Sequence, residues 1–222
     1  MISLQNVNFK YDKNLNILNN VTIDLDNNEK YAFIGENTYD GKSIFFRLLT
    51  GLEKRYTGEI FLNSQNIKTI DFSQDYSMGY IPHKIPFFYH KTVYQNLEYV
   101  FNVRGIFDGY DQKITNAITN FGLAEFKDTP IKKLTKAQKL MVALSRLSLR
   151  SIDCLLIENY VDELNEEELK TIQELIKKIF VINKDIIFLC DTNNQNFISE
   201  LDLDVIRLTS GQIEKGARDN AG

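Results

Sequence analysis

The sequence lacks any apolar run of about 18 residues, the length that a helix needs to cross a bilayer. Its N-terminus also lacks the charged and then apolar pattern of a secretory signal. We therefore expect a chain that is soluble by itself and that reaches a membrane only through a partner.

Basic residues do not outnumber acidic ones, and cysteines are few. Lys and Arg number 26 against 30 Asp and Glu, which gives a net charge of −4. No basic face is evident, so we expect no nucleic-acid partner. The two cysteines, Cys154 and Cys190, both lie inside apolar runs. This placement is typical of reduced, buried thiols in a cytoplasmic protein.

What the chain does contain is enough apolar sequence for one sizeable core, since 43% of its 222 residues are hydrophobic. Continuous apolar strands alternate with amphipathic helices, which favours a parallel α/β core. The expected strands are 1–11 (an edge strand, from its alternating pattern), 21–25, 31–34, 58–62, 78–81, 154–157, 186–189, 205–208 and 211–213. The expected helices are 44–50, an all-helical insertion within 92–122, 136–149 and 166–180.

The most informative segment is the loop that follows the strand at 31–34. It closes on Gly41-Lys42-Ser43 and opens a helix, an arrangement that suits a phosphate group. The lysine would contact the terminal phosphates and the hydroxyl would bind Mg²⁺. Five residues lie between Gly35 and Gly41, whereas the P-loop pattern has four. The segment is therefore either a working nucleotide site or the remnant of one.

Further segments resemble motifs of one protein family. Thr57-Gly58-Glu59-Ile60 and Thr92-Val93-Tyr94-Gln95-Asn96-Leu97 are similar to its "TGEI" and "TVxEN" stretches, and Gly79-Tyr80-Ile81-Pro82-His83 to the strand before its Q-loop. Leu134-Thr135-Lys136-Ala137-Gln138 resembles LSGGQ, and Leu155-Leu156-Ile157-Glu158-Asn159-Tyr160 resembles Walker B. Together, in this order, they resemble the nucleotide-binding domain of ABC transporters over nearly the whole chain.

This resemblance implies a P-loop NTPase-like ABC ATPase core with an N-terminal antiparallel β subdomain and an inserted α-helical subdomain. The expected organisation is a single ABC-type domain over residues 1–222, with the helical subdomain at approximately 84–150. The resemblance further implies that Tyr11 stacks on the adenine of ATP. It implies that the other residues that bind ATP are Gly35, Asn37, Gly41, Lys42 and Ser43, and that Mg²⁺ is bound by Ser43 and Glu158. Tyr11 has an equally simple interpretation as an exposed aromatic residue at a strand end.

The departures from the family pattern fall on the hydrolytic chemistry. The metal-binding aspartate of Walker B becomes Glu158, and the glutamate that polarises the attacking water becomes Asn159. An amide can hold a water but cannot accept its proton. The switch histidine becomes Asp191, and a carboxylate ~4 Å from a phosphate oxygen would cost on the order of 4 kcal/mol at an effective dielectric constant of about 20.

The remaining substitutions concern the loops that meet the nucleotide in this family. His83 replaces the Q-loop glutamine and Asn165 the D-loop aspartate. In the LSGGQ equivalent, Lys136 and Ala137 replace two glycines, while Thr135 keeps a hydroxyl and Gln138 is retained. No catalytic residue is assigned.

Three hypotheses remain open. In the first, the chain is a degenerate ATP-binding subunit that docks on an integral membrane protein, binds ATP weakly and hydrolyses little or none. In the second, it is an active ATPase that energises a transporter or a transporter-like membrane complex. In the third, it is a structural subunit that binds no nucleotide. The resemblance also implies a homodimer or a heterodimer with another ABC subunit, located in the cytoplasm on the inner face of the membrane. The aromatic run Phe87-Phe88-Tyr89 is a candidate contact with the membrane partner.

Overall fold

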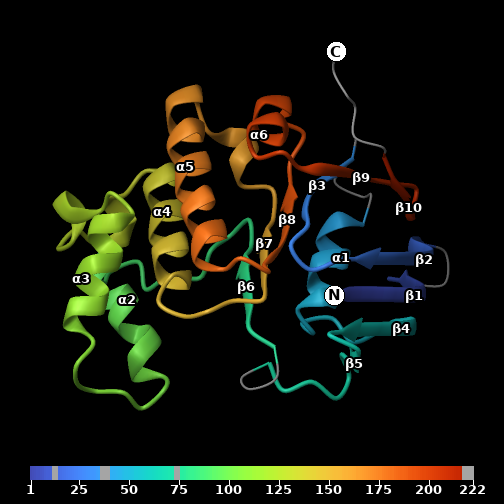
Figure 1. Ribbon diagram of the computed structural model, residues 1–222, viewed down its shortest axis with the longest axis horizontal. Helices are drawn as coiled ribbons and strands as arrows, with labels where there is room; N and C mark the ends of the chain where they lie inside the picture. The colour runs from blue at the N-terminus through green and yellow to red at the C-terminus, as the bar shows by residue number, and fades with distance from the viewer. Residues whose placement is uncertain (12–14, 36–40, 73–75, 217–222) are drawn as a thin grey trace. The chain divides into compact units, whose positions relative to one another are not determined.

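The computed structural model describes residues 1–11, 15–35, 41–72 and 76–216. The chain divides into two compact units, each of which is described by itself. Unit 1 comprises Met1–His83, Ile152–Asp162 and Lys184–Gly222, and unit 2 comprises Lys84–Ser151 and Glu163–Asn183. The sheets belong to unit 1 and the long helices to unit 2 (Figure 1).

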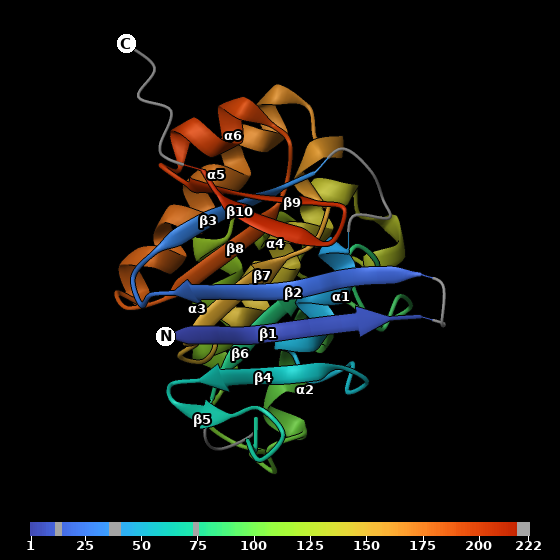
Figure 2. The ribbon, with the colours of Figure 1, turned by 90° about the vertical axis from the view of Figure 1, so that its right-hand side faces the viewer.

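Unit 1 contains a four-stranded antiparallel sheet in the order β2-β1-β4-β5 (Figure 2). Its strands are β1 (Ile2–Lys10), β2 (Asn16–Leu25), β4 (Thr57–Leu62) and β5 (Gln65–Asn66). The sequence pattern suggested that β1 is an edge strand, and this was wrong, because β1 pairs with both β2 and β4. Its alternation instead reflects a sheet with one buried and one exposed face.

The second sheet of unit 1 has six strands in the order β10-β9-β3-β8-β7-β6. Strands β3 (Lys30–Ile34), β6 (Met78–Ile81), β7 (Cys154–Ile157), β8 (Ile187–Asp191) and β9 (Asp204–Thr209) are parallel, and β10 (Gln212–Lys215) is antiparallel to β9. Phe33 pairs with Asp191, and Ile157 pairs with Cys190. The residues that follow β3, β7 and β8 therefore meet at the carboxyl edge of one sheet, where parallel α/β sheets bind their ligands.

Helix α1 (Lys42–Leu49) packs into one hydrophobic core with both sheets. Phe33 of β3 stacks on Phe45 of α1 at 4.7 Å between ring centroids and meets Phe46 edge to face at 6.0 Å. Aromatic pairs of this kind contribute about 0.5–1.5 kcal/mol beyond their buried area. The core thus fixes α1 against β3, and with it the two residues that follow Gly41.

Unit 2 is helical and consists of α2 (Val93–Asn102), α3 (Asp111–Asn120), α4 (Lys136–Leu147) and α5 (Glu166–Ile182) (Figure 1). Two short 3₁₀ turns, Ala124–Phe126 and Ile131–Lys133, connect α3 to α4. Each helix buries one stripe, such as Leu169, Ile172, Ile176 and Ile179 on α5. A third 3₁₀ turn, Val161–Glu163, follows β7, and the short helix α6 (Gln195–Glu200) follows β8 in unit 1.

The predicted α/β core, antiparallel N-terminal sheet and helical insertion are confirmed. The two cysteines are buried, as predicted. Three elements differ from the sequence prediction. Strand β2 begins at Asn16 instead of residue 21, and β5 and α6 were not predicted. These segments contain asparagine or glutamine and show no apolar periodicity, so the sequence pattern does not predict them. Their backbone pairing and helix capping are seen only in the structure.

Candidate functional site

Gly41 and the start of α1 are shaped by the neighbouring backbone. Gly41 is the N-cap of α1 with φ 88°, in the left-handed region that favours glycine. A Cβ added there would lie 2.8 Å from the Ile17 carbonyl oxygen, so the position also needs glycine for space. No side chain caps this helix start, and its first turn contains no acidic residue. The arrangement leaves a helix N-terminus that suits an anion.

Lys42 forms a buried ion pair with Asp191. The Lys42 Nζ lies 2.6 Å from the Asp191 Oδ1, and the two side chains are 11% and 8% exposed. The sequence led us to expect Asp191 to face a bound phosphate; in the structure its carboxylate contacts the lysine that would hold that phosphate. A phosphate group must therefore compete with Asp191 for Lys42.

Ser43 and Glu158, the two candidate metal ligands, contact each other. The Ser43 hydroxyl donates to Glu158 Oε1, and the Tyr80 hydroxyl donates to Glu158 Oε2. Burial and the neighbouring Glu158 carboxylate raise the pKa of Tyr80 above its ordinary value. The extra methylene of glutamate thus still reaches the helix start, and Tyr80 joins the site as a partner of Glu158.

This donor set fits Mg²⁺ that arrives with a nucleotide. Mg²⁺ typically takes one or two carboxylates together with substrate phosphates, and Ser43 with Glu158 offers one hydroxyl and one carboxylate. In the part of the chain that the structure describes, no group of three or more His, Cys, Asp or Glu side chains could hold a metal ion. The cluster therefore suits a metal bound through phosphate oxygens better than a metal bound by protein alone.

His83 and Asn159 lie next to each other at the surface. The His83 Nδ1 donates to the Asn159 carbonyl oxygen at 2.9 Å, and both residues are exposed. Asn159 has φ 38°, a left-handed conformation that asparagine tolerates better than most residues. The position expected to carry the hydrolytic base therefore presents a neutral amide on a turn.

A network that sequence reasoning missed holds Gly35, the first residue after β3. The Asn193 side chain accepts from the Gly35 N–H at 3.3 Å and donates to the Gly35 carbonyl at 3.1 Å. Asp162 in turn accepts from the Asn193 N–H at 3.0 Å and from the Thr192 hydroxyl. These residues follow β3, β7 and β8, and the pairing of β8 with both β3 and β7 brings them together.

The other predicted nucleotide contacts have simple surroundings. Tyr11 is 55% exposed and meets Phe9 edge to face at 5.2 Å between ring centroids. Asn37 lies outside the residues that the structure describes.

The substituted loop positions of unit 2 serve as helix starts. Thr135 caps α4 in a capping box, in which its hydroxyl accepts from the Gln138 N–H at 3.2 Å and the Gln138 side chain accepts from the Thr135 N–H at 3.0 Å. Ala137 is buried, and Lys136 pairs with Glu163.

Asn165 caps α5 in the same way, through Glu168. The side chains at these D-loop and LSGGQ positions therefore take part in helix capping, packing and one ion pair.

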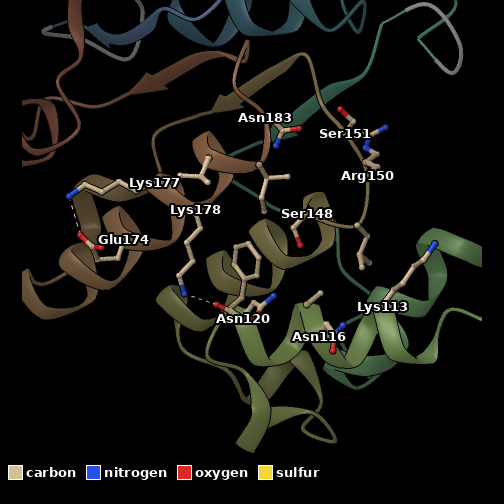
Figure 3. Close-up of a pocket in the computed structure, with 15 residues that line it drawn as sticks. Lys113, Asn116, Asn120, Ser148, Arg150, Ser151, Glu174, Lys177, Lys178 and Asn183 are labelled. Carbon is tan, nitrogen blue, oxygen red and sulfur yellow. Dashed lines mark hydrogen bonds and ion pairs between the residues drawn. The ribbon is translucent and has the colours of Figure 1, made fainter.

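Unit 2 also contains a cavity of ≈ 880 Å³ that lies along α3 and at the carboxyl-terminal ends of α4 and α5 (Figure 3). Its lining includes Lys113, Arg150, Lys177 and Lys178. Lys178 donates to the carbonyl of Asn120 at the end of α3, at 2.9 Å. Because helix C-termini carry partial negative charge, Lys177 and Lys178 near the end of α5 and Arg150 after α4 complement the fold itself. We therefore do not assign the cavity to a phosphate.

None of the helices in the described ranges combines the length and the apolar character needed to span a bilayer.

Comparison with known proteins finds one family model, that of the ABC transporter, over residues 18–161. Among curated relatives, a putative ABC transporter ATP-binding protein of Clostridium tetani is 23% identical over 215 residues, covering 96% of this chain and 48% of its own length. The lantibiotic transport ATP-binding protein SrtF of Streptococcus pyogenes is 26% identical over 180 residues, covering 80% of this chain and 75% of the relative. The chain spans less than half the length of the first two curated relatives, at 48% and 44%.

Solved structures give the same fold. A structure of an ATP-binding subunit of an ABC transporter superposes with a TM-score of 0.80 at 20% identity, covering 99% of this chain and 91% of the other. A bacterial Atm1-family ABC exporter with ATP bound has a TM-score of 0.81 at 20% identity, covering 97% of this chain and 38% of the other. The expected ABC ATPase fold is thereby confirmed.

Proposed function

This chain belongs to the ABC transporter family, and from that premise we propose that it is a degenerate ATP-binding subunit of a membrane protein complex. It binds ATP with Mg²⁺ weakly and hydrolyses it little or not at all, and it acts as a regulatory or scaffolding component. The observation that carries this proposal is the conjunction of Lys42 and of Ser43, hydrogen-bonded to Glu158, at the start of α1 with a neutral Asn159.

The binding half of the proposal rests on the start of α1. Lys42 would hold the terminal phosphates, the uncapped helix N-terminus would contribute N–H groups, and Ser43 with Glu158 would hold Mg²⁺. A bound Mg²⁺ neutralises part of the phosphate charge. Because Lys42 and Glu158 already have partners in this structure, nucleotide binding must replace those contacts, which supports a weak affinity.

The second half of the proposal, little or no hydrolysis, rests on the absence of a general base at Asn159. Asn159 cannot accept the proton of an attacking water at any physiological pH. Tyr80, whose hydroxyl donates to Glu158, stays protonated at neutral pH, because burial and Glu158 raise its pKa above the ordinary value.

Exposed apolar side chains of unit 2 support docking on a partner. Phe88, Tyr89 and Tyr99 are each exposed by about 45%, and Phe88 contacts Tyr99 at 4.6 Å between ring centroids. Val103 and Phe107, on the segment between α2 and α3, are 60% and 70% exposed. We propose that this surface contacts an integral membrane protein at the cytoplasmic face of the membrane, and that the chain pairs with itself or with another ABC subunit.

A steady-state assay of phosphate release from Mg-ATP tests the proposal. We expect the wild-type protein to release phosphate no faster than the Lys42→Ala variant. In a thermal-shift titration, Mg-ATP should stabilise the wild type according to RT ln(1 + [L]/Kd). Robust turnover that Lys42→Ala abolishes would refute the degenerate assignment.

Robust turnover would instead favour the active ATPase. In that case Glu158→Gln should reduce hydrolysis strongly, and Asn159→Ala should change it little.

One observation favours a second candidate, the structural subunit without nucleotide. Lys42, Ser43 and Glu158 all have protein partners, so the site is stable without a ligand. Absence of any thermal shift with millimolar Mg-ATP or Mg-ADP would identify this function.

A further inference from the structure

Asp191 is a buried carboxylate that nothing in the hydrolytic chemistry of the site requires. It ends β8, opposite Phe33 of β3, and its Oδ1 lies 2.6 Å from the Lys42 Nζ. With both side chains at or below 11% exposure, solvent screens this attraction little. Asp191 therefore presents to Lys42 the kind of oxygen anion that a phosphate group would present.

The phosphates of a nucleotide do not depend equally on Lys42. In a strand–loop–helix phosphate site, backbone N–H groups of the loop and helix start hold the α- and β-phosphates, and the lysine reaches the β- and γ-phosphates. A γ-phosphate therefore loses more than a β-phosphate when the lysine is shared with a carboxylate. It also adds negative charge beside that carboxylate, which raises the electrostatic cost further.

We propose that Asp191 makes this site select a nucleoside diphosphate over a nucleoside triphosphate, because it occupies Lys42, which the γ-phosphate needs. This inference rests on the proposed function, since it assumes that the Lys42 site binds nucleotide. It concerns which nucleotide is held and is separate from the loss of the hydrolytic base.

A purely structural ion pair gives a different expectation. If Asp191 only stabilised the fold, its replacement would lower the affinity of both nucleotides by the same factor or leave both unchanged. Only competition between Asp191 and the γ-phosphate for Lys42 changes the ratio of the affinities for Mg-ADP and Mg-ATP.

The experiment is isothermal titration calorimetry of the wild type and of Asp191→Asn with Mg-ADP and with Mg-ATP. The matched control is Glu53→Gln. Glu53 is also a buried carboxylate of unit 1 with a cationic partner, Arg55, and its replacement changes the net charge by the same amount.

We expect wild type and Glu53→Gln to bind Mg-ADP at least roughly tenfold more tightly than Mg-ATP, and up to about a thousandfold where the effective dielectric constant is about 20, because one like charge lies near the γ-phosphate. In Asp191→Asn, the affinity for Mg-ATP should rise by the same factor and the preference for Mg-ADP should disappear. Nucleotide binding with the same affinity ratio in wild type and Asp191→Asn overturns the inference and leaves the proposed function intact. Absence of binding by every variant overturns both.

The wild type alone keeps the inference testable should Asp191→Asn fail to fold. Wild-type protein that binds Mg-ATP as tightly as Mg-ADP, or more tightly, contradicts the proposed selectivity without any variant. Asp191→Ser, which also removes the charge, provides a second test of the changed ratio.

Discussion

The residues at the family's motif positions make different kinds of contact in the two units of the chain. In unit 2, Thr135 with Gln138 and Asn165 with Glu168 form capping boxes within four residues of sequence. In unit 1, Lys42 with Asp191 and Ser43 with Glu158 pair across more than 100 residues and involve charged groups. The caps serve the helix that carries them, whereas a ligand of the same charge can replace one partner in the long-range pairs. The capping boxes of unit 2 are therefore local structure, whereas the pairs of unit 1 join residues that are distant in sequence.

The largest expected effect comes from breaking the Lys42–Asp191 pair. Lys42→Met should lower the free energy of unfolding by about 3–5 kcal/mol, because it leaves the Asp191 carboxylate buried beside an apolar side chain. The double variant Lys42→Met/Asp191→Asn should be less destabilised than the sum of the two single variants. Denaturant unfolding of all four proteins gives the coupling energy. Strict additivity would show that the pair has no energetic role.

A smaller effect should follow from loosening the start of the phosphate loop. Asn193→Ala removes the side chain that pairs with both backbone groups of Gly35, so we expect a loss of roughly 1–3 kcal/mol. Hydrogen exchange at the Gly35 amide should increase with it. The control is Asn196→Ala on α6, an exposed asparagine of the same segment. Equal stability of the two variants would contradict the role given to Asn193.

Removal of either capping box of unit 2 should lower the free energy of unfolding by about 1 kcal/mol. Thr135→Ala and Asn165→Ala remove the side-chain acceptor at the N-cap of α4 and α5, and Thr135→Ser and Asn165→Asp restore it. These losses should be the same with and without Mg-ADP, as thermal unfolding can measure. A cap variant that changed nucleotide affinity would break the distinction between the two units.

The smallest expected effect on stability comes from the ion pair of Glu53 with Arg55, two residues apart in unit 1. Arg55 lowers the pKa of the Glu53 carboxyl to about 2, through hydrogen bonds from its side chain and backbone. A carboxyl with a depressed pKa stabilises the fold above its ordinary pKa of 4.5, and this contribution is lost as the pH falls towards 2. In Glu53→Gln, the fall in stability over that pH range should be shallower than in the wild type. Parallel pH profiles of the two proteins would exclude this contribution.

The sequence predicts the elements of this fold well, because they depend on apolar periodicity. The buried strand at 31–34 and the stripe of α5 are examples that the structure confirms. The position of β1 was mispredicted, since alternation reports which face is buried and says nothing about neighbouring strands. Asparagine-rich β2 began earlier than predicted for a similar reason, since its first residues pair through the backbone.

The candidate site was predictable only in its motif residues. Gly41, Lys42 and Ser43 are adjacent in sequence, and Glu158 follows a recognisable apolar strand. The partners Tyr80, Asp162 and Asn193 could not be predicted, because strand pairing brings them in from distant segments. The ion pair of Asp191 with Lys42 likewise follows from the register of β8 against β3.

The side-chain amide of Asn193 hydrogen-bonds to Gly35 through one donor and one acceptor, as the backbone of a neighbouring strand would. Asp162, on the segment that follows β7, in turn accepts from the Asn193 N–H. Two side chains thus connect the ends of β3, β7 and β8. A displacement of one of these chain segments would therefore strain the hydrogen bonds that hold it to its neighbours.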